Sequence, residues 1–199
     1  IEQYWDIDLQ AENKTITDAV AIERCSELLT TSVKRRLRSD VSVGTSLSGG
    51  LDSSSIAALI HELQSGKNYS CFTASFPELE NNDLFHAKNV AEHFGLQQHI
   101  AECNAAGLME DWEKICYYQE EPFGSAGTYA QFKVYELAKE RGVKVLLDGQ
   151  GADEILAGYH KYYKWYWQEL FRQRKLKKSK EIFWAKEIGI NEPFDYRNR

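Results

Sequence analysis

The residues best suited to do chemistry lie in one short segment, SLSGGLDSS, at residues 46–54. Binding of a phosphate requires several backbone N–H groups to converge on one point. Glycines such as Gly49 and Gly50 let the chain bend and approach a ligand closely. A helix start behind the loop adds unpaired amides and a dipole that favours negative charge. This first motif is therefore predicted to cradle an anion, with added neutral donors from Ser48, Ser53 and Ser54.

An acid, Asp52, lies inside the first motif, and the Gly-Lys-Ser/Thr ending of a Walker loop is absent. No lysine of the motif neutralises the phosphates. A carboxylate beside phosphates is chemically reasonable when a divalent cation bridges the two. The alternative is a serine-rich turn between a strand and a helix, in which Asp52 only caps the helix. The richness of the motif in glycine and serine favours the anion cradle.

A second acidic, glycine-rich loop, LDGQGADEILAGY, occupies residues 147–159 and also follows an apolar run. In an open parallel sheet, ligands bind at the carboxyl ends of strands where the winding reverses direction. If the strands before the two motifs are neighbours at that point, the motifs face one crevice. Asp52 and Asp153 are then predicted to hold one Mg²⁺ ion on a polyphosphate, because Mg²⁺ prefers oxygen ligands.

The elements that must position these loops alternate along the chain. Four short apolar runs, at residues 41–47, 69–76, 97–101 and 143–147, are each followed by a helical pattern. Such alternation predicts βαβ units and an α/β fold with a doubly wound, mostly parallel, Rossmann-like sheet.

Helix ends are predicted from caps and glycines. Thr17 caps a first helix whose apolar face contains Ile22, Cys25, Leu29, Val33 and Leu37. Two later helices close at Gly66 and Gly95. Further helices are predicted at 104–118 and at 128–141, the second capped by Thr128 and stopped by Gly142.

Composition sets limits on function. The chain has 199 residues, 43% of them hydrophobic, and a net charge of -6, which argues against a protein that coats nucleic acid. Its four cysteines stand far apart, which predicts unpaired thiols in a reducing compartment, the cytoplasm. No run is long enough to span a bilayer, so no membrane association is expected.

Three segments are expected from the change in composition along the chain. Residues 1–16 form a lead-in segment or an edge strand, and residues 17–158 form the α/β domain that contains both motifs. Residues 159–199 form an aromatic, basic and helical extension, predicted to be the start of a helical layer that the chain does not finish.

The two motifs together carry a resemblance. SGGLDSS is similar to the PP-loop of the ATP pyrophosphatases, and LDGQGADEILAGY resembles the second signature of the synthetase domain of glutamine-hydrolysing asparagine synthetases. The resemblance extends from about Tyr4 to about Tyr163. It implies an adenine nucleotide α-hydrolase-like fold, with ATP and Mg²⁺ as cofactors.

The resemblance also implies roles for individual residues. It assigns the pyrophosphate end of ATP to the first motif, namely Leu47, Ser48, Gly49, Gly50, Leu51, Asp52, Ser53 and Ser54. It places the adenosine near Ala74 and Ser75, and the nucleotide also near Gly149. Asp52 and Asp153 would bind the metal, Glu154 would lie near the amino-acid substrate, and Gln150 would lie near the reacting groups.

The reaction implied is attack of the aspartate side-chain carboxylate on the α-phosphorus of ATP, which gives an aspartyl-adenylate and pyrophosphate. Ammonia then displaces AMP. The expected partners are ATP, aspartate or a related carboxylate, ammonia, and a glutaminase domain or subunit, with a homodimer left open.

The chain departs from the family pattern at several positions. Gln150 stands where a carboxylate is common, and an amide cannot take a proton at ordinary pH. Asp148 replaces a small residue, and Ala157-Gly158 stands where Gly-Gly is usual. A glutaminase domain and the later helical region have no counterpart, so the chain is interpreted as a fragment with weak or no activity alone.

Two alternatives to asparagine synthesis stay open. The chain could belong to another carboxyl-adenylating amidotransferase or a β-lactam-forming synthetase. It could also be a nucleotide-binding module without catalytic activity.

Overall fold

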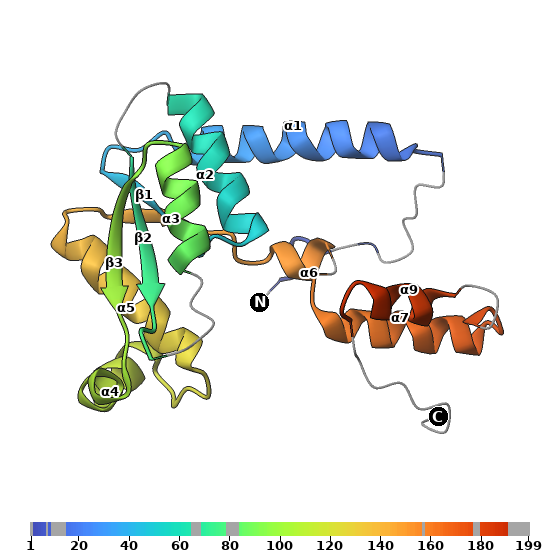
Figure 1. Cartoon of the computed structure of the whole chain (residues 1–199). Coiled ribbons are helices and arrows are strands. Elements are labelled where there is room, and N and C mark those ends of the chain that lie inside the picture. Colours follow the sequence, from blue (N-terminus) through green and yellow to red (C-terminus); the bar gives the residue numbers. More distant parts are fainter. Residues whose placement is uncertain are drawn as a thin grey trace. The chain divides into compact units, whose positions relative to one another are not determined.

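The computed structural model describes residues 2–6, 8, 15–64, 69–78, 84–156, 158–176 and 180–190. The chain divides into two compact units, Ile1–Asp148 and Gly149–Arg199. The first unit contains a sheet and its covering helices, and the second contains helices (Figure 1).

The first unit is built on a four-stranded sheet in the order β3-β2-β1-β4. The strands are β1 (Val43–Ser46), β2 (Ser70–Ser75), β3 (Gln97–Glu102) and β4 (Val145–Leu147). All three pairings are parallel, and Thr45 lies opposite both Cys71 and Leu147. Since β1 and β4 are neighbours although β2 and β3 intervene in the sequence, the winding reverses there. The expected doubly wound parallel α/β fold is confirmed.

Helices cover both faces of this sheet. The helices are α1 (Asp18–Arg36), α2 (Leu51–Gln64), α3 (Leu84–His93), α4 (Ala105–Gln119) and α5 (Ala126–Glu140). On one face, Leu47 and Cys71 pack with alanines of α2 and α3. On the other face, Phe72 packs with Val134 and Ala138 of α5. Neighbouring β2 residues therefore enter different cores, as the alternation of strand side chains requires.

Among the predicted helix ends that lie within the described residues, one cap differs from the structure. Thr17 caps α1 by accepting a hydrogen bond from the backbone N–H of Val20. Gly95 and Gly142 adopt positive φ just beyond α3 and α5. The cap of α5 is Ser125 rather than Thr128, because the helix begins earlier and the Ser125 hydroxyl accepts from Gly127 N. Gly66 lies outside the described residues.

The predicted apolar face of α1 is buried only at its C-terminal end. Val33 is 5% exposed and packs with Ile60 and Leu147, whereas Ile22 is 70% exposed. The 3.6-residue period thus predicted the helix correctly but overestimated how much of it packs on the first unit.

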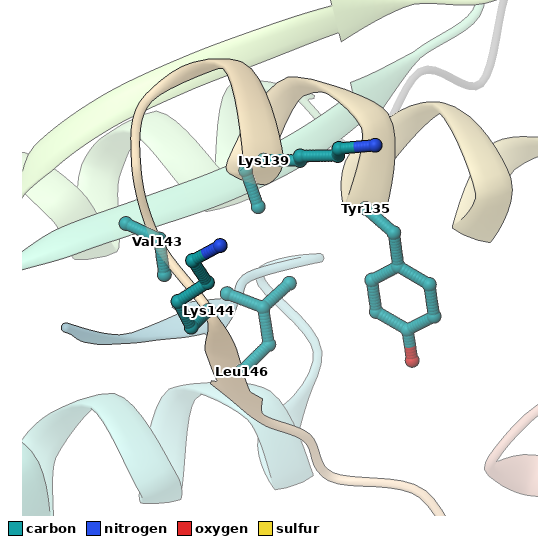
Figure 2. Close-up of a pocket in the computed structure, with 6 residues that line it drawn as sticks. Tyr135, Lys139, Val143, Lys144 and Leu146 are labelled. Carbon is teal, nitrogen blue, oxygen red and sulfur yellow. The ribbon is translucent and has the colours of Figure 1, made fainter. Parts of the chain in front are cut away.

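Beside the sheet, α5 and β4 enclose a cavity of about 410 Å³ (Figure 2). Its lining is partly apolar and partly cationic: Tyr135, Ala138, Lys139, Val143, Lys144 and Leu146. A second cavity of about 690 Å³ lies along α4 and α5, and it shares Tyr135 and Lys139 with the first. Neither cavity is lined by a residue of the two motifs that was predicted to bind ligands.

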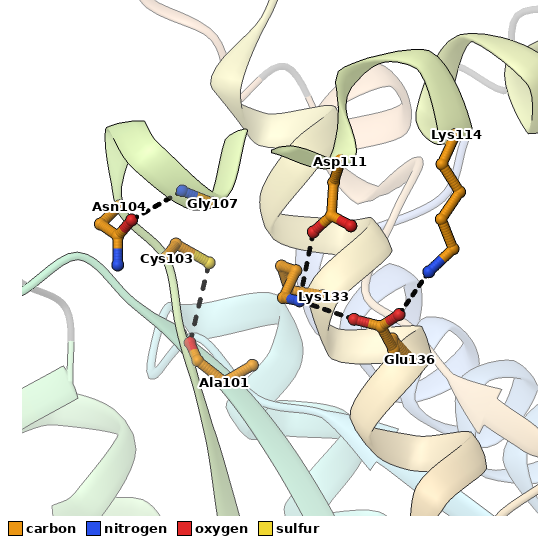
Figure 3. A network of polar contacts seen from close by, with 8 residues as sticks. All are labelled: Ala101, Cys103, Asn104, Gly107, Asp111, Lys114, Lys133 and Glu136. Atoms are coloured by element: carbon orange, nitrogen blue, oxygen red, sulfur yellow. Dashed lines mark hydrogen bonds and ion pairs between the residues drawn. The ribbon is translucent and has the colours of Figure 1, made fainter. Parts of the chain in front are cut away.

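A polar network joins α4 to α5 (Figure 3). The Lys133 ammonium lies 3.3 Å from Asp111 and 2.6 Å from Glu136, and Lys114 lies 2.6 Å from the other Glu136 oxygen. The hydrogen bonds from both lysines hold the pKa of Glu136 below its ordinary value. Because Lys133 bridges both helices, the network fixes α4 against α5.

The second unit contains α6 (Ala152–Leu156), α7 (His160–Arg172) and α9 (Glu181–Glu187). Its core consists of Trp167, Leu170, Leu176, Ala185 and Ile190. In its described residues, the aromatic, basic segment after Tyr159 therefore forms helices, and some of its apolar side chains bury one another.

The described cysteines are all free: Cys71 and Cys103 are buried, Cys116 is half-buried and Cys25 is exposed. Burial raises the pKa of the Cys71 thiol to about 12, so this thiol stays protonated and unreactive. None of the helices in the described ranges combines the length and apolar character needed to cross a membrane.

Candidate functional site

The first motif leaves the sheet on a backbone that is fixed by buried hydrogen bonds. Leu47 N donates to Phe72 O at 2.8 Å, and the Thr73 hydroxyl donates to Leu47 O at 2.7 Å. Gln98 in turn donates to the Thr73 hydroxyl at 2.9 Å. Because Leu47 is 1% exposed and Thr73 2%, these bonds lie in the interior and hold the start of the loop in one place.

Gly49 is required by two independent features of the turn. Its φ of +84° lies in the left-handed region that residues with a side chain rarely adopt. A Cβ atom built at Gly49 would overlap the backbone nitrogen of Ala87 and lie 2.6 Å from the carbonyl carbon of His86. The loop therefore packs directly against the backbone of α3, which only glycine permits.

Two serines hold the turn from inside. The Ser48 and Ser53 hydroxyls are 3.0 Å apart, and Ser53 Oγ accepts from Ser48 N at 3.3 Å. Gly50 N donates to Ser48 Oγ at 3.3 Å, and the Ser53 hydroxyl donates to Gly50 O at 3.2 Å. These bonds position Gly50 at the start of α2, where first-turn N–H groups have no partner within the helix.

Ser54 contributes a further donor. Its hydroxyl oxygen is buried and has no hydrogen-bond partner among the described residues. An unpaired buried hydroxyl costs about 1–3 kcal/mol, which a ligand oxygen at this end of α2 could offset. The fold thus provides what an anion requires: a glycine turn against backbone, a helix start and an unsatisfied hydroxyl.

Asp52 lies half-buried in the first turn of α2, together with exposed Leu51. Among the described residues, no three His, Cys, Asp or Glu side chains gather into a metal-binding group. One carboxylate suits Mg²⁺ all the same, since this ion is commonly held by one or two carboxylates, substrate phosphates and water. The donor set therefore fits an ion that arrives with a polyphosphate.

Ala74 and Ser75 end β2 at the same edge of the sheet. Ser75 is 2% exposed, and its carbonyl accepts from Cys103 N at 2.7 Å. Ala74 is partly buried and packs against the core that contains Ala101 of β3 and Val134 of α5. Their place at the carboxyl edge agrees with the expected nucleoside position, and a contact with adenosine remains a prediction.

The end of β4 is tied to β1. The Thr45 hydroxyl, fully buried, donates to Leu147 O at 2.9 Å across the switch point of the sheet. The next residue, Asp148, accepts a hydrogen bond from the Tyr135 hydroxyl of α5 at 3.3 Å. The strands before the two motifs are thus neighbours, which is the condition on which the predicted common crevice depended.

The rest of the second motif begins the second unit and is held by local contacts. Gly149 O accepts from Ala152 N, and the Asp153 carboxylate lies directly against Gly158, where a Cβ would collide with it. Glu154 accepts from the Tyr159 hydroxyl at 2.9 Å, which raises the pKa of Tyr159. Gln150 is exposed in the turn before α6.

Asp52 belongs to the first unit and Asp153 to the second, so their shared metal site remains a prediction. Several residues that matter here were not singled out in the sequence: Thr45, Thr73, Gln98, Gln131 and Tyr135. For the threonines a signal existed, because a polar residue inside an apolar strand must find a buried partner. Tyr135 has no such signal, since its partner Asp148 lies beyond the end of another element, β4.

Comparison with known proteins identifies the relatives. Residues 24–194 match the model of the family described as asparagine synthase. The chain is 33% identical over 171 residues to a putative asparagine synthetase 2 (glutamine-hydrolyzing) of Methanocaldococcus jannaschii, covering 85% of this chain and 32% of that protein. It is 29% identical over 177 residues to amidase chry2 of Gibberella zeae, covering 78% of this chain and 26% of that protein.

The chain therefore spans about a third or less of the length of these curated relatives. Among solved structures, the NH3-dependent NAD synthetase of Campylobacter jejuni aligns with a TM-score of 0.43 and 15% identity, covering 83% of each chain. The U34-tRNA thiolase NcsA of Methanococcus maripaludis aligns at 0.46 and 15%, covering 89% of this chain and 69% of that one. The fold assignment rests on the strand order of this chain itself. Since the family model matches most of the residues, this chain belongs to the asparagine synthase family.

Proposed function

We propose that this chain is the ATP-binding part of an enzyme that forms an amide from a carboxylate, ATP and ammonia. The first motif carries the proposal: Gly49 packs on the backbone of α3, and the buried Ser54 hydroxyl has no partner among the described residues. Membership of the asparagine synthase family supports the reaction class.

The substrate proposed first is aspartate, after the relatives named asparagine synthetase. A side-chain carboxylate oxygen attacks the α-phosphorus of ATP, the bond to the β-phosphate breaks, and pyrophosphate leaves. Ammonia then attacks the acyl carbon, and the bond to AMP breaks. The protein contributes mainly by positioning the reactants and stabilising charge.

The chain's own residues would act as follows. The N–H groups at the start of α2 and the Ser54 hydroxyl bind phosphate oxygens. Ser48 and Ser53 hold the turn through their mutual contact. Asp52 would hold Mg²⁺, with Asp153 as a second ligand, and Glu154 would face the amino-acid substrate. When bound, Mg²⁺ neutralises charge on the phosphates.

Partners are part of the same proposal. The relatives named as glutamine-hydrolyzing suggest that a glutaminase domain or subunit supplies the ammonia. A homodimer and a cytoplasmic location are further proposals of the same kind.

A second candidate is amide formation on another carboxylate. It is favoured by the similarity to relatives named amidase, chry2 of Gibberella zeae and chyE of Penicillium rubens, each 29% identical. Gln150 also favours this candidate, because the second motif here has an amide where the family commonly has a carboxylate. The third candidate, a nucleotide-binding module without turnover, predicts ATP binding and no pyrophosphate release.

The test uses the full-length protein encoded by the open reading frame of this chain. Release of AMP and pyrophosphate is measured with ATP, Mg²⁺, ammonia and a panel of carboxylates that includes aspartate and glutamate. Release that depends on aspartate, with formation of asparagine, supports the first candidate. Release with another carboxylate supports the second, and ATP binding without release on any member supports the third.

A further inference from the structure

We infer that Asp148 accepts the proton that the nitrogen nucleophile loses during amide formation, and that Tyr135 is a positioning residue for it. This inference rests on the proposed function and names a further residue of the same site. Its starting point is the hydrogen bond between the Tyr135 hydroxyl and the Asp148 carboxylate, which joins α5 to the end of β4.

The backbone before Asp148 is fixed beside the strand of the first motif. Leu147 pairs with Thr45 of β1, and its carbonyl accepts from the Thr45 hydroxyl at 2.9 Å. Leu147 is 7% exposed and Thr45 is fully buried, so this junction lies inside the first unit. Asp148 is the next residue and is half-buried at the carboxyl edge where ligands bind in such sheets.

The side chain of Asp148 is oriented by two donors in series. Gln131 Nε2 donates to the Tyr135 hydroxyl oxygen at 2.9 Å, and Tyr135 donates to Asp148 Oδ2 at 3.3 Å. Figure 2 shows Tyr135 extending from α5 toward the chain that leaves β4. Burial, together with the charge of Asp148, raises the pKa of Tyr135, so the phenol keeps its proton and remains the donor.

This arrangement leaves one carboxylate oxygen for a ligand. Among the described residues, only Oδ2 of Asp148 takes part in a hydrogen bond, and no ion pair involves Asp148. The Asp148 carboxylate is therefore held through Oδ2 by a neutral phenol, and Oδ1 has no hydrogen bond among the described residues.

Other acids nearby are placed less well for this role. Asp111 and Glu136 are bound by lysine ammonium groups of the α4–α5 network. Glu102 ends β3, two strands away from β1. Gln150 carries an amide, which cannot accept a proton at ordinary pH. Asp52 lies in the loop proposed to bind phosphates.

The step balances without another reactant. The nitrogen lone pair of ammonia attacks the acyl carbon of the adenylate, and the C–N bond forms as the C–O bond to AMP breaks. The electron pair of that bond leaves with AMP. One proton passes from nitrogen to Asp148 Oδ1 and then to water, which regenerates the carboxylate.

The experiment separates the two half-reactions in the full-length protein. Carboxylate-dependent exchange of pyrophosphate into ATP reports adenylation, and formation of amide with added ammonia reports the second step. Asp148→Asn is expected to change exchange less than about threefold and to lower amide formation about 100-fold, the usual size of a general-base effect. Glu102→Gln is the matched control, because it replaces a carboxylate at the same edge of the sheet, at the end of β3. It should alter neither rate.

Tyr135→Phe tests the positioning role. It is expected to lower kcat for ammonia about fivefold, with little change in KM. In the double variant with Asp148→Asn it should have no further effect, because it acts through the carboxylate. A purely structural role would instead lower both half-reactions and add to the effect of Asp148→Asn.

The following results would overturn the inference. One is amide formation at the wild-type rate in Asp148→Asn. Another is an equal loss of pyrophosphate exchange and amide formation in the same variant. Asp148→Ser, measured with ATP affinity as the check on folding, must agree with Asp148→Asn. If the wild-type protein shows no pyrophosphate exchange with any carboxylate, the proposed function is overturned as well. Failure of the inference about Asp148 and failure of the proposed function are therefore distinguishable.

Discussion

The two acidic glycine loops of this chain are held by different kinds of contact. The loop after β1 touches three other elements: Thr73 of β2 binds Leu47 O, the backbone of α3 abuts Gly49, and Ser53 of α2 holds Ser48. Within the second unit, the described contacts of Asp153 and Glu154 are with Gly158 and Tyr159, a few residues along the chain.

The first loop is therefore ordered by packing against other elements, whereas the described contacts of Asp153 and Glu154 lie within the second loop itself. A loop packed against three elements can bind phosphate without paying to order its backbone. Asp148 joins the two cases, because it belongs to the second loop yet accepts a hydrogen bond from Tyr135 of α5.

The largest effect is expected from adding a methyl group to the glycine of each loop. Gly49→Ala should lower the free energy of unfolding by about 3 kcal/mol or more, because positive φ and overlap with the α3 backbone act together. Gly151 has a similar φ of +89° but no atom within 4 Å of the added methyl group, so Gly151→Ala should cost only about 1–2 kcal/mol. Denaturant unfolding measures both, and equal losses would contradict the comparison.

The next effect concerns ATP. Asp52→Asn should weaken ATP binding at least about tenfold in the presence of Mg²⁺, and much less without it, because a carboxylate ligand is lost. Asp18→Asn removes an acid from the first turn of α1 and serves as the matched control for the helix dipole. Titration calorimetry gives the affinities. An unchanged ATP affinity in Asp52→Asn, with and without Mg²⁺, would show that Asp52 does not bind the metal.

A smaller effect is expected from acid on the first unit. Lys114 and Lys133 lower the pKa of Glu136 in the folded protein. The stabilisation is therefore present above the pKa of the unfolded chain and is lost as pH falls through the folded-state value. Partial exposure limits it to about 1 kcal/mol. The free energy of unfolding should fall less between about pH 5 and pH 3 in Glu136→Gln than in the wild type.

The control for that comparison is Glu113→Gln, which changes an exposed acid of α4 and should retain the wild-type pH dependence. If the free energy of unfolding depends on pH in the same way in Glu136→Gln and in the wild type, the ion pairs of Glu136 do not contribute to acid sensitivity.

The smallest effect is expected at Ser54. Ser54→Ala removes a buried hydroxyl without a described partner, so stability should stay within about 0.5 kcal/mol of the wild type or rise. ATP affinity should fall about threefold, the loss of one neutral hydrogen bond. Ser55→Ala, whose hydroxyl binds Leu51 O within the helix, is the control for ATP affinity. A loss of stability with unchanged affinity would assign Ser54 a structural role.

Much of the first unit could be predicted because its signals are local. Apolar runs and glycines marked all four strands and the ends of α3 and α5, and Thr17 marked the start of α1. The predictions were wrong or incomplete where the outcome depends on tertiary packing or on the exact start of a helix. The period of α1 could not show that Ile22 stays exposed, and Ser125 could not be preferred over Thr128 without knowing where α5 begins.

The sequence by itself determined the parallel α/β class and the two acidic glycine motifs, since both depend on residue types at short spacing. Only the tertiary structure decided that Gly49 meets the backbone of α3, that Ser54 lacks a partner, and that Tyr135 reaches Asp148. Except for the Ser54 hydroxyl, these are contacts between different elements of the fold. Such contacts arise from how β4 returns beside β1 and how α5 packs on the sheet, which no short window of sequence contains.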